Sequence, residues 1–186
     1  YFIKMNSILR KDTTIIKALD KDQLKDQKKN IYFADKFLSK KENYTGQVYR
    51  ASTISNQFMV DLMKQVEKWY IYEDNWFMST SSTLKAAEDF IKDEAQFNKV
   101  VVMKINSKTW KNIEDISNKK KKKEVLFRPN TKFKVISLQK DDKKWYYIIN
   151  MDELDSEEYK EIELTIIDQL WQIYDKQIEK IRKTYR

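Results

Sequence analysis

Apolar residues recur every three or four positions in two long stretches near the start of the chain, which is the spacing of one face of a helix. The first stretch, residues 1–41, carries them at Ile15, Ile16, Leu19, Leu24, Tyr32, Phe33, Phe37 and Leu38. The second, residues 55–72, carries them at Phe58, Met59, Leu62, Met63, Val66 and Tyr70, after Ser55 as a plausible N-cap. Both patterns predict helices that cover a core, and neither contains a chemical motif of its own.

The middle of the chain changes to short apolar runs rich in β-branched and aromatic residues, which are typical of strands. These runs span residues 46–52, 99–105, 125–127, 133–138 and 145–151. A short helix entered through Ser82 is expected at about 84–91, and Pro129-Asn130 fits a tight turn because asparagine tolerates a positive φ. The pattern predicts a mixed α+β domain.

A helical period returns after Asp152. Asp155 or Ser156 can cap a helix with a stripe of apolar residues, which extends to about Tyr185. Such a helix either packs back along the domain or projects to contact a partner helix. We therefore divide the chain into an N-terminal helical region (1–42), a core (43–152) and a long C-terminal helix (153–186).

Composition narrows the classes of function. The chain has 186 residues and 41% hydrophobic content, with neither cysteine nor histidine, so catalytic devices and zinc sites that rely on those residues are excluded, and we expect no metal. No apolar run approaches 18 residues and no signal-peptide pattern is visible, so we expect no membrane span and an intracellular, cytoplasmic location. Tyr1 in place of a methionine suggests a piece of a longer chain.

The net charge is +8, and part of the excess lies in the lysine run 119–123. Five ammonium groups in a row are more often a solvated loop than a dedicated site. A polyanion-binding module is the least favoured of our hypotheses, and we do not expect nucleic acid to be the partner.

Three separated blocks carry the candidate chemistry. They are Gly46-Gln47-Val48-Tyr49-Arg50-Ala51-Ser52, Trp76-Phe77-Met78-Ser79-Thr80-Ser81-Ser82, and Lys123-Glu124-Val125-Leu126-Phe127-Arg128-Pro129-Asn130-Thr131-Lys132-Phe133. An arginine late in a strand, an aromatic-led Ser-Thr-Ser and a glutamate opening a Val-Leu-Phe strand, in this order, resemble the mono-ADP-ribosyltransferases of the R-S-E class. The branch related to poly-ADP-ribose polymerases usually has a histidine where this chain has Arg50, so only the arginine branch fits.

The resemblance implies an α+β ADP-ribosyltransferase fold, in which two packed mixed β-sheets form an NAD cleft. It implies NAD as the substrate that supplies ADP-ribose, with contacts from Arg50, Ala51, Ser79, Thr80 and Ser81. We expect the cleft to bring Arg50, Ser79 and Glu124 together from distant strands.

The resemblance also assigns a role to each catalytic candidate. Arg50 would bind the diphosphate, Ser79 would orient Glu124, and Glu124 would face the ribose 2′-hydroxyl and the developing cation. Each residue has a plainer interpretation as well: an ion pair for Arg50, a cap or turn for the Ser-Thr-Ser segment, and a surface ion pair for Glu124.

One position departs from the family pattern. Arginine-modifying members show Glu-x-Glu and several others Gln-x-Glu, whereas this chain has Lys122-Lys123-Glu124. The first of these positions recognises the acceptor, and a lysine there repels a substrate guanidinium. Lys122 therefore puts arginine transfer in doubt, and an acidic or phosphate-bearing acceptor is the alternative.

We predict an NAD-dependent mono-ADP-ribosyltransferase that modifies a protein acceptor, or an NAD glycohydrolase if acceptor recognition is lost. The alternative is a catalytically inactive scaffold or binding module of the same fold, with the C-terminal helix as its partner surface.

Overall fold

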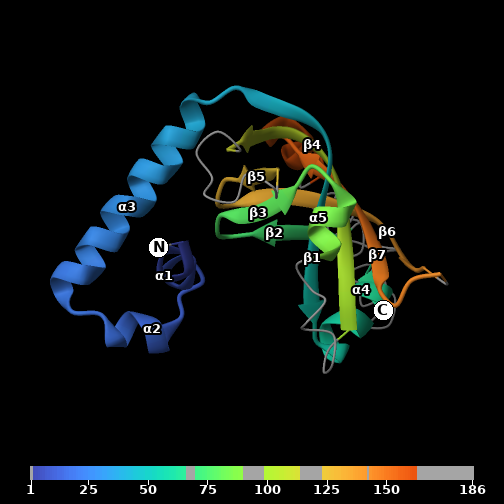
Figure 1. The fold of residues 1–186 in the computed structure, drawn as a ribbon, viewed down its shortest axis with the longest axis horizontal. Helices are drawn as coiled ribbons and strands as arrows, with labels where there is room; N and C mark the ends of the chain where they lie inside the picture. Colours follow the sequence, from blue (N-terminus) through green and yellow to red (C-terminus); the bar gives the residue numbers. More distant parts are fainter. Residues whose placement is uncertain (1, 66–69, 90–98, 114–122, 142, 163–186) are drawn as a thin grey trace, which may run out of the picture. The chain divides into compact units, whose positions relative to one another are not determined.

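A computed structural model describes residues 2–65, 70–89, 99–113, 123–141 and 143–162. Its helices are α1 (Phe2–Leu9), α2 (Thr13–Ala18), α3 (Lys21–Lys40), α4 (Asn56–Gln65) and α5 (Leu84–Glu88) (Figure 1). Its strands are β1 (Asn43–Ile54), β2 (Ile71–Asp74), β3 (Met78–Ser81), β4 (Lys99–Asn112), β5 (Glu124–Phe127), β6 (Thr131–Lys140) and β7 (Tyr147–Leu154). The predicted α+β class is confirmed.

The strands form one hydrogen-bonded network in the order β1-β3-β5-β4-β7-β6-β2, with a further pairing between β1 and β4. The long β4 pairs with β7 over Val101–Asn106 and with β5 at Lys111 and Asn112. Two arms therefore leave β4 at different points along its length: β5 with β3, and β7 with β6 and β2. The β4–β7 pairing is parallel, and the other registered pairings are antiparallel.

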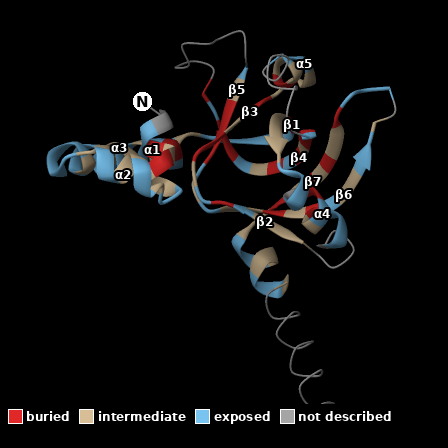
Figure 2. Cartoon of the chain, turned by 90° about the horizontal axis from the view of Figure 1, so that it is seen from below, coloured by how far each residue is buried: buried red, intermediate tan, exposed pale blue. Residues whose placement is uncertain are grey.

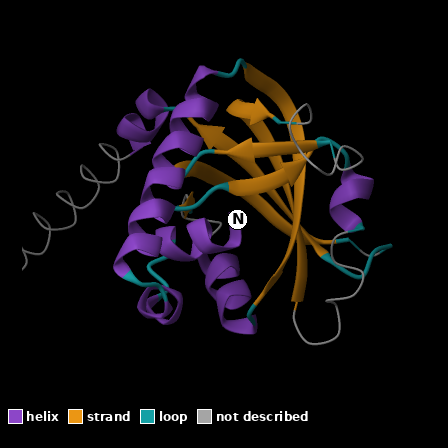
Figure 3. Ribbon diagram, turned by 60° about the vertical axis from the view of Figure 1, so that its left-hand side comes forward, coloured by secondary structure: helices purple, strands orange, loops and turns teal. Residues whose placement is uncertain are grey.

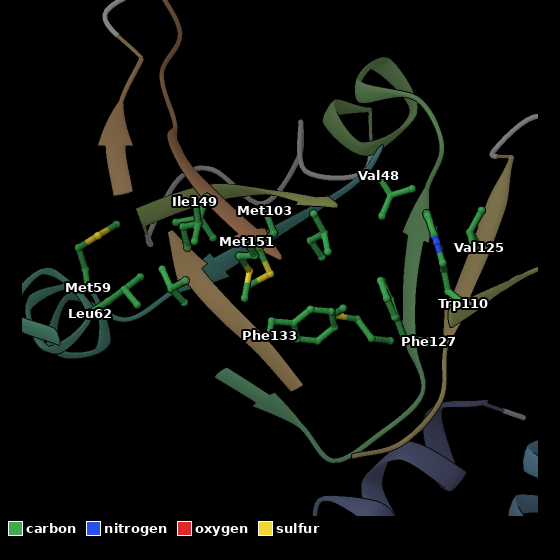
Figure 4. Close-up of a cluster of buried hydrophobic side chains, with 14 residues drawn as sticks. Val48, Met59, Leu62, Met103, Trp110, Val125, Phe127, Phe133, Ile149 and Met151 are labelled. Carbon is green, nitrogen blue, oxygen red and sulfur yellow. The ribbon is translucent and has the colours of Figure 1, made fainter. Parts of the chain in front are cut away.

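The main core lies between the two arms. Phe127 of β5 contacts Phe133 of β6 edge to face, with ring centroids 5.0 Å apart, although these strands are not neighbours in the sheet. Trp110 of β4 stacks on Phe127, also at 5.0 Å. Met59 and Leu62 of α4 complete this cluster (Figure 4). Packing between aromatic rings thus joins the arm that carries Glu124 to the arm that carries β2.

The N-terminal helices are held by their caps and by a second, smaller core. Asp12 caps α2, and Asp20 forms a capping box with Gln23 at the start of α3. Figure 3 distinguishes the helices from the strands, and Figure 2 shows that most of α3 is exposed whereas the strands carry most of the buried positions. Its Leu38 packs in a cluster with Phe77, Ile113 and Leu126. The predicted N-terminal helices are present, but of the apolar positions expected to face the core Tyr32, Phe33 and Phe37 are exposed and Leu38 is buried.

The prediction for residues 55–72 is partly wrong. Helix α4 is described over Asn56–Gln65, residues 66–69 lie outside the described residues, and Ile71–Asp74 form β2, which pairs with β6. Met63, expected in the core, is 49% exposed, although Met59 and Leu62 are buried as expected. The short helix α5 has Thr83 rather than Ser82 at its N-cap position.

The backbone conformation at two positions explains which residues occupy them. The single glycine, Gly46, has a φ of 152° beside the bulge in β1, and a Cβ there would meet the Tyr44 ring at 3.0 Å. Asn130 adopts a φ of 64° in the turn from β5 to β6, as expected for asparagine.

The chain divides into two compact units, Tyr1–Glu153 and Leu154–Arg186. In the second unit Asp155 accepts hydrogen bonds from the backbone N–H groups of Glu157 and Glu158, and residues 156–162 are helical. Asp155 is therefore the cap, and the predicted remainder of this helix lies outside the described residues. Across the described residues, no helix is long and apolar enough to cross a membrane.

Candidate active site

The pairing of β3 with β5 places the second and third sequence blocks side by side. Ser81 lies opposite Glu124 in this antiparallel ladder, so Ser79 is the diagonal neighbour of Glu124 on the same face. The Ser79 hydroxyl donates to Glu124 Oε1 over 2.5 Å. A hydroxyl-to-carboxylate bond of this length is charge-assisted and strong. Ser79 thus holds one oxygen of a half-buried carboxylate.

Arg50 brings the first block to the same place. It lies near the end of β1, with its side chain on the same face of the strand as buried Val48. Arg50 Nη1 donates to the backbone carbonyl of Ser79 over 2.8 Å. Two consecutive hydrogen bonds therefore join Arg50, Ser79 and Glu124, although Arg50 and Glu124 lie 74 residues apart in the chain.

The other predicted ligand-binding residues make structural contacts. Thr80 is buried, and its hydroxyl donates to the Val125 carbonyl over 2.9 Å, which ties β3 to β5. Ser81 Oγ accepts from the Thr83 backbone N–H over 3.2 Å at the entry to α5, the cap-or-turn role considered above. The Ala51 side chain packs against the cluster of Val100, Val102 and Tyr146. Their contacts with NAD stay predictions.

The residue before Glu124 has an unusual backbone. Lys123 has a φ of 44°, a left-handed conformation that is uncommon for a lysine and found mostly at functional or tightly constrained positions. Its carbonyl accepts from Ser82 N over 3.2 Å, which anchors the start of β5 to the end of β3. Lys122 and most of the lysine run lie outside the described residues.

In such an arrangement the guanidinium can bind an anionic diphosphate, and the carboxylate held by a hydroxyl can stabilise a carbon that becomes cationic. A family model described as NAD:arginine ADP-ribosyltransferase matches residues 29–158, which include all three residues. The chain belongs to this family. Its members use NAD as the donor of ADP-ribose, so the resemblance inferred from the three blocks is confirmed.

Solved structures agree on the fold of this ADP-ribosyltransferase. The Vis toxin from Vibrio splendidus is 21% identical with a TM-score of 0.64, over 84% of this chain and 68% of that chain. The C3 exoenzyme from Clostridium limosum is 18% identical with a TM-score of 0.56, over 82% and 78%. Exoenzyme S from Pseudomonas aeruginosa is 19% identical with a TM-score of 0.56, over 82% and 66%. A comparison with curated protein sequences found no match.

One buried acidic residue near these strands was not predicted from the sequence. Asp74, the last residue of β2, is fully buried, and its Oδ2 has no hydrogen-bond partner among the described residues. Burial raises the pKa of Asp74 to about 6, against the opposing effect of the nearby Arg50 charge. Its position depends on β2, which the sequence pattern did not reveal.

The N-terminal helix α1 contributes to the site through the segment before Ser79. The Asn6 side chain donates to the Phe77 carbonyl over 3.1 Å and accepts from the Phe77 N–H over 3.2 Å. Arg10 lies over the Trp76 ring, 4.0 Å from its centroid. These contacts fix the entry into β3. Sequence periodicity could not distinguish them from ordinary helix packing.

Within the described ranges, no group of three acidic side chains is arranged to hold a metal ion.

Proposed function

We propose that this protein is a mono-ADP-ribosyltransferase that transfers ADP-ribose from NAD to a protein acceptor and releases nicotinamide. The observation that carries the proposal is the chain of hydrogen bonds from Arg50 through Ser79 to Glu124. Membership of the family supports the use of NAD, and the geometry supports a role for each of these residues.

Arg50 is suited to bind the diphosphate. Its guanidinium keeps its charge at ordinary pH and offers five donors in a fixed plane. Among the described residues, only the Ser79 carbonyl accepts a hydrogen bond from it. The remaining donors are available for phosphate oxygens, while the bond to Ser79 fixes the plane of the guanidinium relative to Glu124.

Glu124 is suited to the reacting ribose. The bond between C1′ and the nicotinamide nitrogen breaks with its electron pair going to nicotinamide, which leaves positive charge on the ribose as in glycoside cleavage. A fixed carboxylate that accepts a hydrogen bond from the 2′-hydroxyl stabilises this charge without reorganising. The Ser79 hydroxyl, bonded to Oε1, orients this carboxylate.

The acceptor completes the reaction when its nucleophilic atom attacks C1′ and loses a proton. The Vis toxin has been solved in complex with agmatine, a small guanidinium compound. Lys122 repels such a group in this chain, so we propose an acidic protein acceptor, with water taking its place in slow NAD hydrolysis.

The test follows both products from labelled NAD. The proposal predicts that nicotinamide release is accompanied by label transfer to an acidic protein, with little transfer to agmatine. Lys122→Glu should increase agmatine modification at least about tenfold, because it restores a carboxylate for the guanidinium. A Lys64→Glu variant on α4 provides the same charge change elsewhere. Release without transfer to any acceptor would reduce the function to NAD hydrolysis.

The departure at Lys122 also favours a second candidate, a catalytically inactive protein with this fold that binds a partner through its C-terminal segment. That candidate predicts no nicotinamide release from the folded protein, and loss of partner binding when residues after Tyr159 are removed.

A further inference from the structure

One side of α3 exposes three aromatic rings. Tyr32 is 59% exposed, Phe33 52% and Phe37 47%, and the first two rings meet edge to face with their centroids 5.5 Å apart. The other side of the helix packs on the strands through Ile31 and Leu38. The rings are therefore left in water by a helix whose core contacts are already made, and a group of exposed apolar side chains of this kind marks an interaction surface.

Lysines surround these rings. Each ring has an ammonium group over it, 5.6–5.9 Å from its centroid: Lys29 over Phe33, Lys36 over Tyr32 and Lys41 over Phe37. At 3.6 residues per turn, Lys29, Lys36 and Lys40 lie in a row directly opposite buried Leu38. Tyr32 lies on one side of this row, and the two phenylalanines lie on the other.

The second half of α3 has a strong positive excess. Residues 28–41 contain five lysines and one acidic residue, Asp35, which gives a net charge of +4. Asp35 is already neutralised, because it accepts two hydrogen bonds from Arg128, from Nε at 2.7 Å and from Nη2 at 2.8 Å. The remaining charged side chains of this half are all lysines, so the surface is complementary to an anionic partner.

We propose that this surface, called the α3 patch and formed by Lys29, Tyr32, Phe33, Lys36, Phe37 and Lys40, binds an anionic phospholipid membrane. Aromatic rings favour the interfacial zone of a bilayer, and lysines next to them attract anionic head groups. The lysine stems can lie along the rings while their ammonium groups reach the phosphates. The contact is peripheral, since no helix in the described part of the chain could cross a membrane.

Two other anionic partners fit the α3 patch less well. Single-stranded nucleic acid stacks its bases on open aromatic faces, whereas each ring here has an ammonium group over it. An acidic helix of a partner protein is usually bound in a groove, whereas the patch is the convex outer side of a single helix, most of which is exposed (Figure 2). An extended anionic surface matches this shape.

Co-sedimentation of the unmodified protein with lipid vesicles tests the proposal. Binding to vesicles with about 30% phosphatidylserine should be at least about tenfold tighter than binding to phosphatidylcholine alone. The double variant Phe33→Ser, Phe37→Ser should bind the anionic vesicles about tenfold more weakly, because less apolar surface enters the interface. Trp145→Ser removes a ring that is 53% exposed elsewhere on the protein and should bind like the unmodified protein.

The net charge of +8 alone attracts anionic vesicles, so a second pair of variants separates the α3 patch from the overall charge. Lys29→Glu with Lys36→Glu should abolish the preference for phosphatidylserine. Lys140→Glu with Lys143→Glu makes the same change in net charge near the end of β6 and should weaken binding only a few-fold. All of the substituted residues are exposed, and urea denaturation checks that each variant is folded.

Three results would overturn the inference. They are equal losses of vesicle binding in the two lysine variants, unchanged vesicle binding after loss of both phenylalanines, and absence of vesicle binding by the unmodified protein. In the last case, binding of single-stranded RNA that depends on Phe33 and Phe37 would assign the α3 patch to nucleic acid instead. None of these measurements uses NAD, so their outcome does not depend on the proposed function.

Discussion

Two buried carboxylates of this ADP-ribosyltransferase have opposite surroundings. Glu153 of β7 is 1% exposed, and its Oε2 accepts from Ser107 Oγ and Lys108 N, both at 2.6 Å, and from Thr109 N at 3.0 Å. Its Oε1 accepts from the Thr109 hydroxyl. Asp74 is equally buried, yet it has one long backbone bond and an oxygen without a partner.

The difference separates a carboxylate that the fold satisfies with hydrogen bonds from one that it leaves largely unsatisfied. Glu153 satisfies the backbone where β4 turns from its pairing with β7 toward its pairing with β5. Glu124 is intermediate, because Ser79 holds one of its oxygens. Carboxylates that the fold does not fully satisfy are more common at functional sites than in structural cores.

The largest expected effect on stability comes from removing Glu153. Glu153→Ala leaves up to four donors without an acceptor, so we expect a loss of roughly 3–4 kcal/mol in the free energy of unfolding, measured by urea denaturation. Nicotinamide release per folded molecule should not change. Asp152→Ala, which removes an exposed partner of Asn106 from the adjacent position, should cost much less. Equal losses of unfolding free energy in the two variants would show that the hydrogen bonds of Glu153 contribute no special stability.

Asp74→Asn should change stability in the opposite direction. Burial raises the pKa of Asp74 from 3.8 to about 6, so the folded state binds the extra proton and stability falls as the pH rises from about 4 to 6. Asparagine cannot ionise, so the variant should be more stable above this window, by up to about 3 kcal/mol at pH 8, and similar to the unmodified protein near pH 4. Urea denaturation at both pH values checks this. If Asp74→Asn were destabilised equally at pH 4 and pH 8, Asp74 would be a carboxylate that stabilises the fold, as Glu153 is.

Ser79→Ala tests how far the position of Glu124 depends on the Ser79 hydroxyl. Loss of the 2.5 Å bond removes this constraint on the carboxylate, so we expect kcat for nicotinamide release to fall roughly 10- to 30-fold, with a smaller change in KM for NAD. Ser39→Ala on exposed α3 controls for the loss of a hydroxyl. An unchanged kcat would mean that Glu124 is positioned without the Ser79 hydroxyl.

The smallest effect is expected from α1. Asn6→Ala removes both bonds to the Phe77 backbone and should cost about 1 kcal/mol of stability, with a few-fold loss of nicotinamide release because β3 is less well fixed. Asn6→Asp keeps the acceptor for Phe77 N–H, so its stability and nicotinamide release should lie between those of the unmodified protein and Asn6→Ala. Full activity in both variants would make α1 a cover with no influence on the site.

The order of the candidate residues along the chain could be predicted from the sequence because each lies in a recognisable local motif. Glu124 opens Val-Leu-Phe, and Ser79 comes two residues after the aromatic pair Trp76-Phe77. The hydrogen bond between Ser79 and Glu124 could not be predicted in this way, because the register of β3 against β5 is a tertiary property.

Asp74 was missed for a related reason. The apolar spacing of Val66 and Tyr70 continues the period of α4, which suggested a helix through residue 72. Pairing of Tyr72 with Phe133 overrides that local pattern and makes β2 a strand. The burial of Asp74 follows from this pairing with β6, which no local signal predicts.

The most direct test of the central claim is nicotinamide release from NAD by the unmodified protein and by Glu124→Gln. Glutamine keeps the size of the side chain and can accept from Ser79, but it lacks the negative charge that stabilises the ribose cation. We predict that release falls at least about 100-fold while the free energy of unfolding changes by less than about 1 kcal/mol. Release that survives in a folded Glu124→Gln protein would contradict the assignment of Glu124 and the account built on it.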